Sequence, residues 1–327
     1  MRWRGVRFLR CSSTRGREAT GMVWATVPRA QDQAGRAIMQ AFRTRKATAP
    51  ARRRRDILVG LLGATLIAAA CGAPEPEEIA GWDASDESSA ERIDHSAWQD
   101  LLNAYIAPDE AGVNLVDYEA LQGNAGDAAK LAGYLDYLQG LDPRDYSRAE
   151  QMAYWINFYN ALTVQVVLDA YPVDTIRDIH EGVVPYTGPW DDVHANVAGE
   201  DLTLNHMEHG ILRPIWQDER IHYAVNCAAY GCPHLLDTAF TAANTEELLD
   251  AGARDYVNNP RGVDVVDEDF IVISSIYDWY AEDFGNTEET VMEHLIEHAE
   301  DDLAAFFEGF EGFIEYDYDW SLNRQGR

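Results

Sequence analysis

The sequence predicts an α+β fold: a helix-rich single domain with a small mixed sheet around a central buried helix. Three observations predict this class. From Ser147 to about Ala170, apolar side chains surround the helix axis almost completely, so this helix is expected to be buried. Several other segments have apolar residues at helical spacing. Short alternating segments are few, and they do not alternate regularly with the helices.

The helices follow from spacing and from residues that start or stop a helix. Ser147 caps the central helix, and Pro172 follows its end because proline cannot continue a helix. Other helices are expected after Asp94 to about residue 106, and at 128–138, 246–257, 276–280 and 288–307.

Strands are expected at 221–225, in a hairpin of 263–266 with 270–273, and at 313–318. The aromatic residues at 277–284 are interpreted as core. The acids among them, Asp278 and Asp283, are interpreted as solvated, with Asp278 a minor site candidate.

Asn157 and Asn160 lie three residues apart on the central helix, so they share one face of a buried element. A buried amide without a partner costs about 1–3 kcal/mol, so both need hydrogen bonds. We interpret them as residues that fasten a neighbouring loop rather than as catalytic groups. The predicted polar scaffold is Asn157, Asn160, Arg213, His222 and Asn226.

Asn205 and Glu208 have the spacing of a capping box, which predicts a helix that ends near Leu212. One face of this helix is apolar, and the other carries His206, His209 and Arg213. Glu208 points toward the apolar side. It either caps the first turn or is a buried carboxylate with a raised pKa that acts as an acid or base.

Residues 1–70 are predicted to be a signal or leader segment. Four arginines at 52–55 precede 14 uncharged residues at 57–70, fewer than the ~20 that span a bilayer as a helix. The small residues at 68–70 and Cys71 resemble a lipobox, in which the cysteine receives lipid. The sequence therefore predicts anchoring through Cys71 to a membrane, on the periplasmic or extracellular face of the cell envelope.

Residues 71–90 are predicted to be an acidic flexible tether, because prolines and acids cannot bury a core. Residues 91–327 are predicted to be one globular domain. The leader holds 15 of the 26 basic residues and 3 of the 56 acids, so 71–327 carries a formal net charge of −42. A body this acidic repels phosphate, which excludes nucleic acid as a partner.

Six motifs resemble the domain-of-unknown-function family 547 and cover the chain from Asn114 to its end in the family's order. They are VDY at 116–118, AYWINFYNAL at 153–162, EHGILR at 208–213, HYAVNC at 222–227, GCP at 231–233 and YDWSLN at 318–323. The resemblance implies a bacterial envelope protein of lipoprotein type. It implies no particular reaction, so function has to be inferred from the residues.

Three hypotheses compete for Cys227 and Cys232. An exported C-x4-C pair favours a disulfide, which would close a six-residue loop and stabilise the fold by about 2 kcal/mol. His222 and His234 extend the pair to H-x4-C-x4-C-x-H, but this spacing matches no common zinc site. The third hypothesis makes Cys227 a nucleophile at the end of a strand.

The expected strand restricts the nucleophile hypothesis. Five residues of strand span ~17 Å and place His222 and Cys227 on opposite faces, so His222 is not expected to act as the base. The candidate catalytic residues are therefore Cys227, His209 as base, and Glu208 as the group that orients it.

Two functions of different class remain open. In the first, preferred because no complete catalytic order is visible, the domain is a non-catalytic envelope module that binds a protein or a small molecule. In the second, it is a cysteine-dependent hydrolase or acyl transferase that uses Cys227. No metal and no cofactor are predicted.

Overall fold

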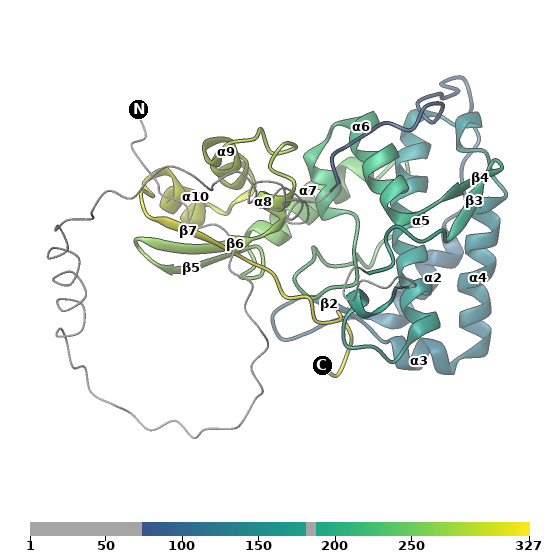
Figure 1. The fold of residues 1–327 in the computed structure, drawn as a ribbon, viewed down its shortest axis with the longest axis horizontal. Coiled ribbons are helices and arrows are strands. Elements are labelled where there is room, and N and C mark those ends of the chain that lie inside the picture. Colours follow the sequence, from purple (N-terminus) through teal and green to yellow (C-terminus); the bar gives the residue numbers. More distant parts are fainter. Residues whose placement is uncertain (1–73, 181–187) are drawn as a thin grey trace, which may run out of the picture. The chain divides into compact units, whose positions relative to one another are not determined.

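The computed structural model describes residues 74–180 and 188–327, which belong to one compact unit. It confirms the α+β class, since helices dominate and the strands form sheets of two or three strands (Figure 1). The predicted signal segment and Cys71 lie outside the described residues. The elements in chain order are α2 (Ser96–Tyr105), β1 (Ile106–Pro108), β2 (Asn114–Val116), α3 (Tyr118–Gly123), α4 (Ala125–Gln139), α5 (Arg148–Ala170), β3 (Ala195–Val197), β4 (Glu200–Leu202), α6 (Arg213–Trp216), α7 (Thr245–Val257), β5 (Val263–Asp267), β6 (Phe270–Ser274), α8 (Ile276–Trp279), α9 (Glu288–His298), α10 (Asp301–Glu308) and β7 (Phe313–Asp317).

Helix α5 is the centre of the larger hydrophobic core. The hydroxyl oxygen of Ser147 accepts a hydrogen bond from the backbone N–H of Glu150 and starts the helix. Every residue at 150–164 is buried, so the helix has no solvent-facing side along these turns. Helices α3 and α4 pack directly on α5, and α2 packs on α4 (Figure 1).

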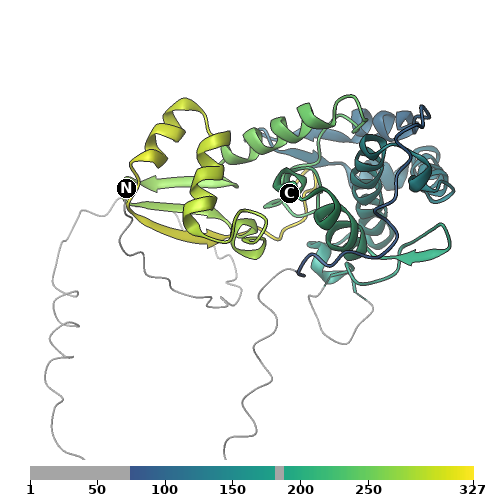
Figure 2. The same cartoon turned by 90° about the horizontal axis from the view of Figure 1, so that it is seen from above.

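A second core lies under the sheet β5-β6-β7. Strands β5 and β6 form an antiparallel hairpin, and β7 pairs with β6 in parallel, from Phe270 opposite Phe313 to Ser274 opposite Asp317. A parallel pair needs a long connection, and α9 and α10 supply it while covering one face of the sheet (Figure 2).

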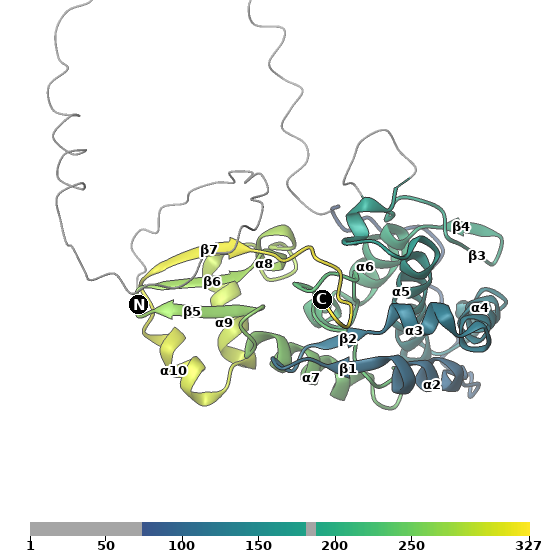
Figure 3. The same ribbon diagram turned by 90° about the horizontal axis from the view of Figure 1, so that it is seen from below.

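The chain after β7 crosses from this sheet to the helical end of the unit. Figure 3 shows it finishing beside β2. The backbone N–H of Val116 donates to the carbonyl oxygen of Asn323 at 2.9 Å. The N–H of Asn323 in turn donates to the carbonyl oxygen of Ala228 at 3.0 Å. The C-terminal residues thereby join β2 to the segment that carries Cys227.

Residues 74–90 differ from the predicted flexible tether. Trp82 is only 2% exposed, and its ring packs edge-on against that of Trp155 at 5.3 Å between centroids. The backbone N–H groups of Glu77 and Ile79 donate to the carbonyl oxygens of His209 and Gly210. The composition of the segment is acidic, but the side chains of Trp82 and Ile79 pack on the domain core, and its backbone hydrogen bonds hold it there.

The strand predicted at 221–225 is wrong. Glu219–Tyr223 is a 3₁₀ helix that begins where the Asp218 carboxylate accepts a hydrogen bond from the Arg220 N–H. All residues at 221–226 are buried, so the apolar alternation reflected burial on several sides rather than the two faces of a strand.

The single helix predicted at 288–307 is two helices. The Asn258 side chain separates them, because its amide donates to the carbonyl oxygen of His298 and its oxygen accepts the N–H of Glu300. Across 74–180 and 188–327, no helix has both the length and the apolar character of a membrane span.

Candidate functional site

Cys227 follows the 3₁₀ helix and is half-buried. The next residue, Ala228, has a φ of 61°, in the left-handed region that costs a residue with a Cβ about 1–2 kcal/mol. The Asn226 side-chain oxygen accepts the Ala228 N–H at 3.0 Å and holds this turn. Backbone strain of this kind concentrates at functional sites.

The scaffold asparagines fix the segments on either side of Cys227. The Asn160 amide donates to the carbonyl oxygen of Ala224 at 2.8 Å, and its oxygen accepts the N–H of Asn226 at 2.8 Å. Asn157 makes the same pair of bonds with the backbone of Phe240. Both amides therefore fasten loops to α5, and their polar atoms are occupied by backbone rather than directed at the thiol.

A second amide pair closes the cysteine loop. The Asn226 amide donates to the carbonyl oxygen of Pro233 at 2.8 Å, across the base of the loop. The Asn323 amide donates to the Asn226 oxygen, and the Tyr118 hydroxyl donates to the Asn323 oxygen. Gly231 lies so close to the C-terminal segment that a Cβ there would come within 2.7 Å of the backbone nitrogen of Asp319.

The structure has Cys227 and Cys232 as free cysteines, with their sulfur atoms 3.1 Å apart. This separation is longer than the ~2.05 Å of a covalent S–S bond, so the predicted disulfide is not formed in the structure. Cys227 is half-buried, whereas Cys232 is buried. The Tyr318 hydroxyl lies 3.2 Å from the Cys227 sulfur.

The environment shifts the pKa values of the two thiols in opposite directions. The hydrogen bond with Cys232 lowers the pKa of the Cys227 thiol against the raising effect of burial, and the hydrogen bond with Tyr318 lowers it further. Burial and the neighbouring Cys227 sulfur raise the pKa of the Cys232 thiol well above its ordinary value. Cys227 is therefore the sulfur that ionises first.

Glu208 is not a helix cap, so the predicted capping box is wrong. The Asn205 side chain makes no cap hydrogen bond and donates instead to Asp191. The helix begins at Thr203, whose hydroxyl accepts the N–H of His206 at 3.0 Å. The segment His206–Leu212 is then π-helical, and this wider turn directs Glu208 inward with a side chain only 7% exposed.

The Glu208 carboxylate makes no hydrogen bond with any residue of the described ranges. Its Oε1 atom lies 3.8 Å from Nδ1 of His222 and 3.9 Å from Nδ1 of His209. Its charge opposes ionisation of Cys227 and so raises the pKa of that thiol. A buried carboxylate in this state has acceptor capacity left for a proton or a ligand.

His222 belongs to a network of contacts with Asp283 and Tyr280 that was not expected from a strand. Its Nε2 lies 2.6 Å from Oδ2 of Asp283, and its ring stacks on Tyr280 at 4.1 Å between centroids. Because a carboxylate only accepts hydrogen bonds, Nε2 carries the proton, and Nδ1 faces Glu208. His222 was excluded as a base because a strand would place it and Cys227 on opposite faces. The segment is a 3₁₀ helix, so this reason no longer applies.

Arg213 and Asp283 complete this network. The Arg213 Nε–H donates to Asp283 at 2.6 Å, and a terminal nitrogen donates to Glu282 at 2.7 Å. Burial raises the pKa of Asp283, but the hydrogen bonds from His222 and Arg213 outweigh it and hold the pKa at about 2. Asp283 is therefore an ion-pair partner rather than the solvated acid expected from the sequence.

His209 is held neutral beside Arg213. Burial lowers the pKa of His209 to about 4, and the positive charge of Arg213 contributes to the lowering while Glu208 opposes it. An Arg213 terminal nitrogen donates to Nδ1 of His209 at 3.0 Å, so this nitrogen is already occupied as an acceptor. His222 is therefore the better placed of the two imidazoles for proton exchange with Glu208.

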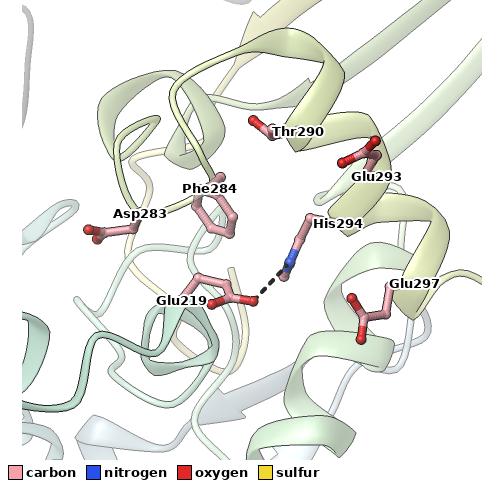
Figure 4. Close-up of a pocket in the computed structure, with 7 residues that line it drawn as sticks. All are labelled: Glu219, Asp283, Phe284, Thr290, Glu293, His294 and Glu297. Carbon is pink, nitrogen blue, oxygen red and sulfur yellow. Dashed lines mark ion pairs between the residues drawn. The ribbon is translucent and has the colours of Figure 1, made fainter.

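Asp283 also lines a pocket of about 240 Å³ (Figure 4). In this view the Asp283 side chain points away from His294 and Glu219, whose atoms approach to 3.5 Å. The residues that line it are Glu219, Asp283, Phe284, Thr290, Glu293, His294 and Glu297. The pocket is acidic, and Cys227 and Glu208 do not line it.

The zinc hypothesis gains no support from the described ranges, in which no group of three or more His, Cys, Asp or Glu side chains is placed to share a metal ion. His222 contacts Asp283, whereas Nδ1 of His234 accepts the backbone N–H of Asn114. The two histidines of the H-x4-C-x4-C-x-H pattern therefore have separate partners.

Residues 143–257 match the model of a family described as "Protein of unknown function, DUF547". The matched range includes Cys227, Glu208, His209 and His222, whereas Asp283 and Tyr318 lie beyond it. The comparisons with curated proteins and with solved structures give no significant match. The family description assigns no reaction, so the chemistry rests on the geometry of the site.

Proposed function

We propose that the chain is a thiol-dependent hydrolase or acyl transferase in which Cys227 is the nucleophile. The observation that carries the proposal is the position of the Cys227 sulfur. It is half-buried, it directly precedes the strained residue Ala228, and two neighbouring hydrogen-bonding groups lower the pKa of its thiol. A thiolate is the nucleophilic form of cysteine, and these features favour it.

The proton acceptor is the pair Glu208 and His222. Their facing atoms are 3.8 Å apart, and Asp283 holds the imidazole with its Nδ1 toward Glu208. The sequence favoured a non-catalytic module because it shows no complete catalytic order, whereas the approach of Glu208 to His222 supports the catalytic proposal. His209 is a positioning residue, because Arg213 occupies its Nδ1.

In the proposed reaction, the Cys227 thiol loses its proton to the Glu208–His222 pair, and the sulfur attacks a carbonyl carbon of the substrate. The bond to the leaving group breaks, and the leaving amine or alcohol takes the proton back. A thioester remains on Cys227. Water or an acceptor amine then attacks it, releases the acyl group and restores the thiol.

Hydrolysis of an activated ester such as p-nitrophenyl acetate tests the proposal. Cys227→Ala is expected to reduce the rate by at least about a hundredfold, since the nucleophile is lost. His206→Gln is the control, because this exposed side chain lies on the same helical segment. A Cys227→Ala rate equal to that of the control would favour a non-catalytic binding module instead.

We also propose that this activity is located at the cell envelope, on a lipid attached to Cys71. The support comes from the sequence alone: the arginines at 52–55, the short uncharged run at 57–70 and the lipobox-like residues before Cys71. Mass spectrometry of the native protein is expected to find an acylated N-terminal Cys71. An unmodified chain that retains residues 57–70 would contradict the anchor.

A further inference from the structure

The Cys227 and Cys232 sulfurs are positioned to become a covalent pair with little movement. They are 3.1 Å apart, so a bond of ~2.05 Å needs an approach of about 1 Å. The loop between them is closed by the Asn226–Pro233 hydrogen bond, and the Cys227 backbone N–H donates to the Cys232 sulfur at 3.1 Å. Rotation of the two side chains is therefore the main change required.

The pair is also asymmetric. Cys227 is half-buried and keeps part of its surface open to solvent, whereas Cys232 is only 5% exposed. The two thiols have opposite pKa shifts, downward for Cys227 and upward for Cys232. An accessible thiolate beside a buried thiol is the arrangement that thiol–disulfide exchange requires of an attacking and a resolving cysteine.

We infer that Cys227 and Cys232 form a reversible dithiol–disulfide couple that exchanges with external disulfides. The Cys227 thiolate attacks one sulfur of a small disulfide such as oxidised glutathione, and one thiolate leaves. The Cys232 thiol then loses its proton and attacks the Cys227 sulfur of the mixed disulfide, which releases the second thiolate. The protein loses two electrons and two protons, and the external disulfide becomes two thiols.

This couple differs from a permanent structural disulfide. A staple that stabilises the fold stays closed in mild reductant, whereas an exchanging pair follows the surrounding thiol–disulfide ratio. The inference does not rest on the proposed hydrolase, because exchange needs only the two sulfurs. If both hold, oxidation removes the nucleophile and stops ester hydrolysis.

The test equilibrates the full-length protein with glutathione buffers of increasing oxidised fraction, blocks free thiols and maps tryptic peptides by mass. Both cysteines fall in the peptide 221–254, between Arg220 and Arg254, apart from Cys11 and Cys71. The expected result is conversion of this peptide to an internal disulfide as the ratio rises, and full return on reduction. A peptide that stays reduced at every ratio, or stays oxidised at every ratio, overturns the couple.

Two matched variants test the roles of the sulfurs. Cys232→Ser is expected to accumulate glutathione on Cys227, because nothing resolves the mixed disulfide. In Cys227→Ser, glutathione is expected to add to Cys232 at least about tenfold more slowly. Equal rates in the two variants, with circular dichroism unchanged from the native protein, would overturn the assignment of Cys227 as the attacking thiol.

Discussion

His222 and Asp283 share a contact of 2.6 Å between Nε2 and Oδ2, although 61 residues separate them in the chain. The same carboxylate oxygen accepts the Nε–H of Arg213 at 2.6 Å. One oxygen thus joins the 3₁₀ helix, the end of the π-helical segment and the loop after α8. It fixes the imidazole tautomer, in which Nδ1 of His222 faces Glu208.

Asp283→Asn is expected to lower the free energy of unfolding by about 2–3 kcal/mol at pH 7, because Arg213 is buried and loses a charged partner. Glu282→Gln is the matched control. Glu282 also pairs with Arg213, but its side chain is more exposed, at 31% against 20%, so a loss below about 1 kcal/mol is expected. Urea unfolding measures both, and equal losses would contradict the role of Asp283.

His209→Gln is expected to reduce the acid sensitivity of the fold. The pKa of His209 is about 4 in the folded chain, below its ordinary 6.5, so the unfolded chain binds this proton first as the pH falls. The stability that the neutral ring contributes is present above pH 6.5 and is lost down to pH 4, on the order of 2–3 kcal/mol.

Urea unfolding at pH 7 and pH 4.5 measures this difference. His95→Gln provides an independent comparison, since burial also lowers the pKa of His95 to about 4 at a separate site beside Tyr134. The two variants are expected to show similar reductions in acid sensitivity, and their effects are expected to add. If the free energy of unfolding of His209→Gln fell between pH 7 and pH 4.5 as steeply as that of the wild type, His209 would be charged in the folded chain.

Tyr318→Phe is expected to raise the pKa of Cys227, because the hydroxyl 3.2 Å from the sulfur no longer donates to the thiolate. Alkylation of Cys227 at pH 7 then slows, and its pH profile moves upward. Tyr316→Phe is the control on the same segment, since the described residues show no hydrogen bond from that hydroxyl. Coincident profiles for the two variants would rule out the contribution of Tyr318.

Ala228→Gly is expected to stabilise the domain by roughly 0.5–1 kcal/mol, because glycine adopts a φ of 61° without the penalty of a Cβ. Ala229→Gly, at the next position without a positive φ, is expected to destabilise it by a similar amount. Thermal unfolding distinguishes the two signs. Destabilisation by both substitutions would mean that the turn after Cys227 is not strained.

Trp82→Ala is expected to cost about 3–5 kcal/mol, the usual loss for a large buried aromatic side chain. Asp83→Ala, an exposed neighbour, is expected to change stability by less than about 0.5 kcal/mol. Chemical denaturation compares them. Small effects from both would restore the interpretation of residues 74–90 as a flexible tether.

Local patterns were sufficient for much of the fold. Three predicted features depend only on residues within one segment. They are the cap at Ser147, the apolar circumference of α5 and the alternation in β5 and β6. The break between α9 and α10 was not predicted, because Asn258, 40 residues away from His298, supplies the hydrogen bond that causes it. The 3₁₀ helix was missed because burial on several sides imitates strand alternation over five residues.

The site was only partly predictable for the same reason. Cys227 and Glu208 stood out by residue type and context, but Asp283 looked like one of many acids in a chain that has 56. Its aromatic neighbours, Tyr280 and Phe284, were the available signal, since a carboxylate among core residues needs a cationic partner. The inward turn of Glu208 depends on a π-helical segment, which the capping-box spacing does not reveal.

Trapping of an acyl group on the protein tests the nucleophile most directly. Native protein is mixed with p-nitrophenyl acetate, quenched in acid and mapped by mass. We predict an acetyl group on peptide 221–254 that hydroxylamine removes and that Cys227→Ser lacks as a thioester. A peptide that remains unmodified while reduced Cys227 is fully accessible to alkylation would contradict the assignment.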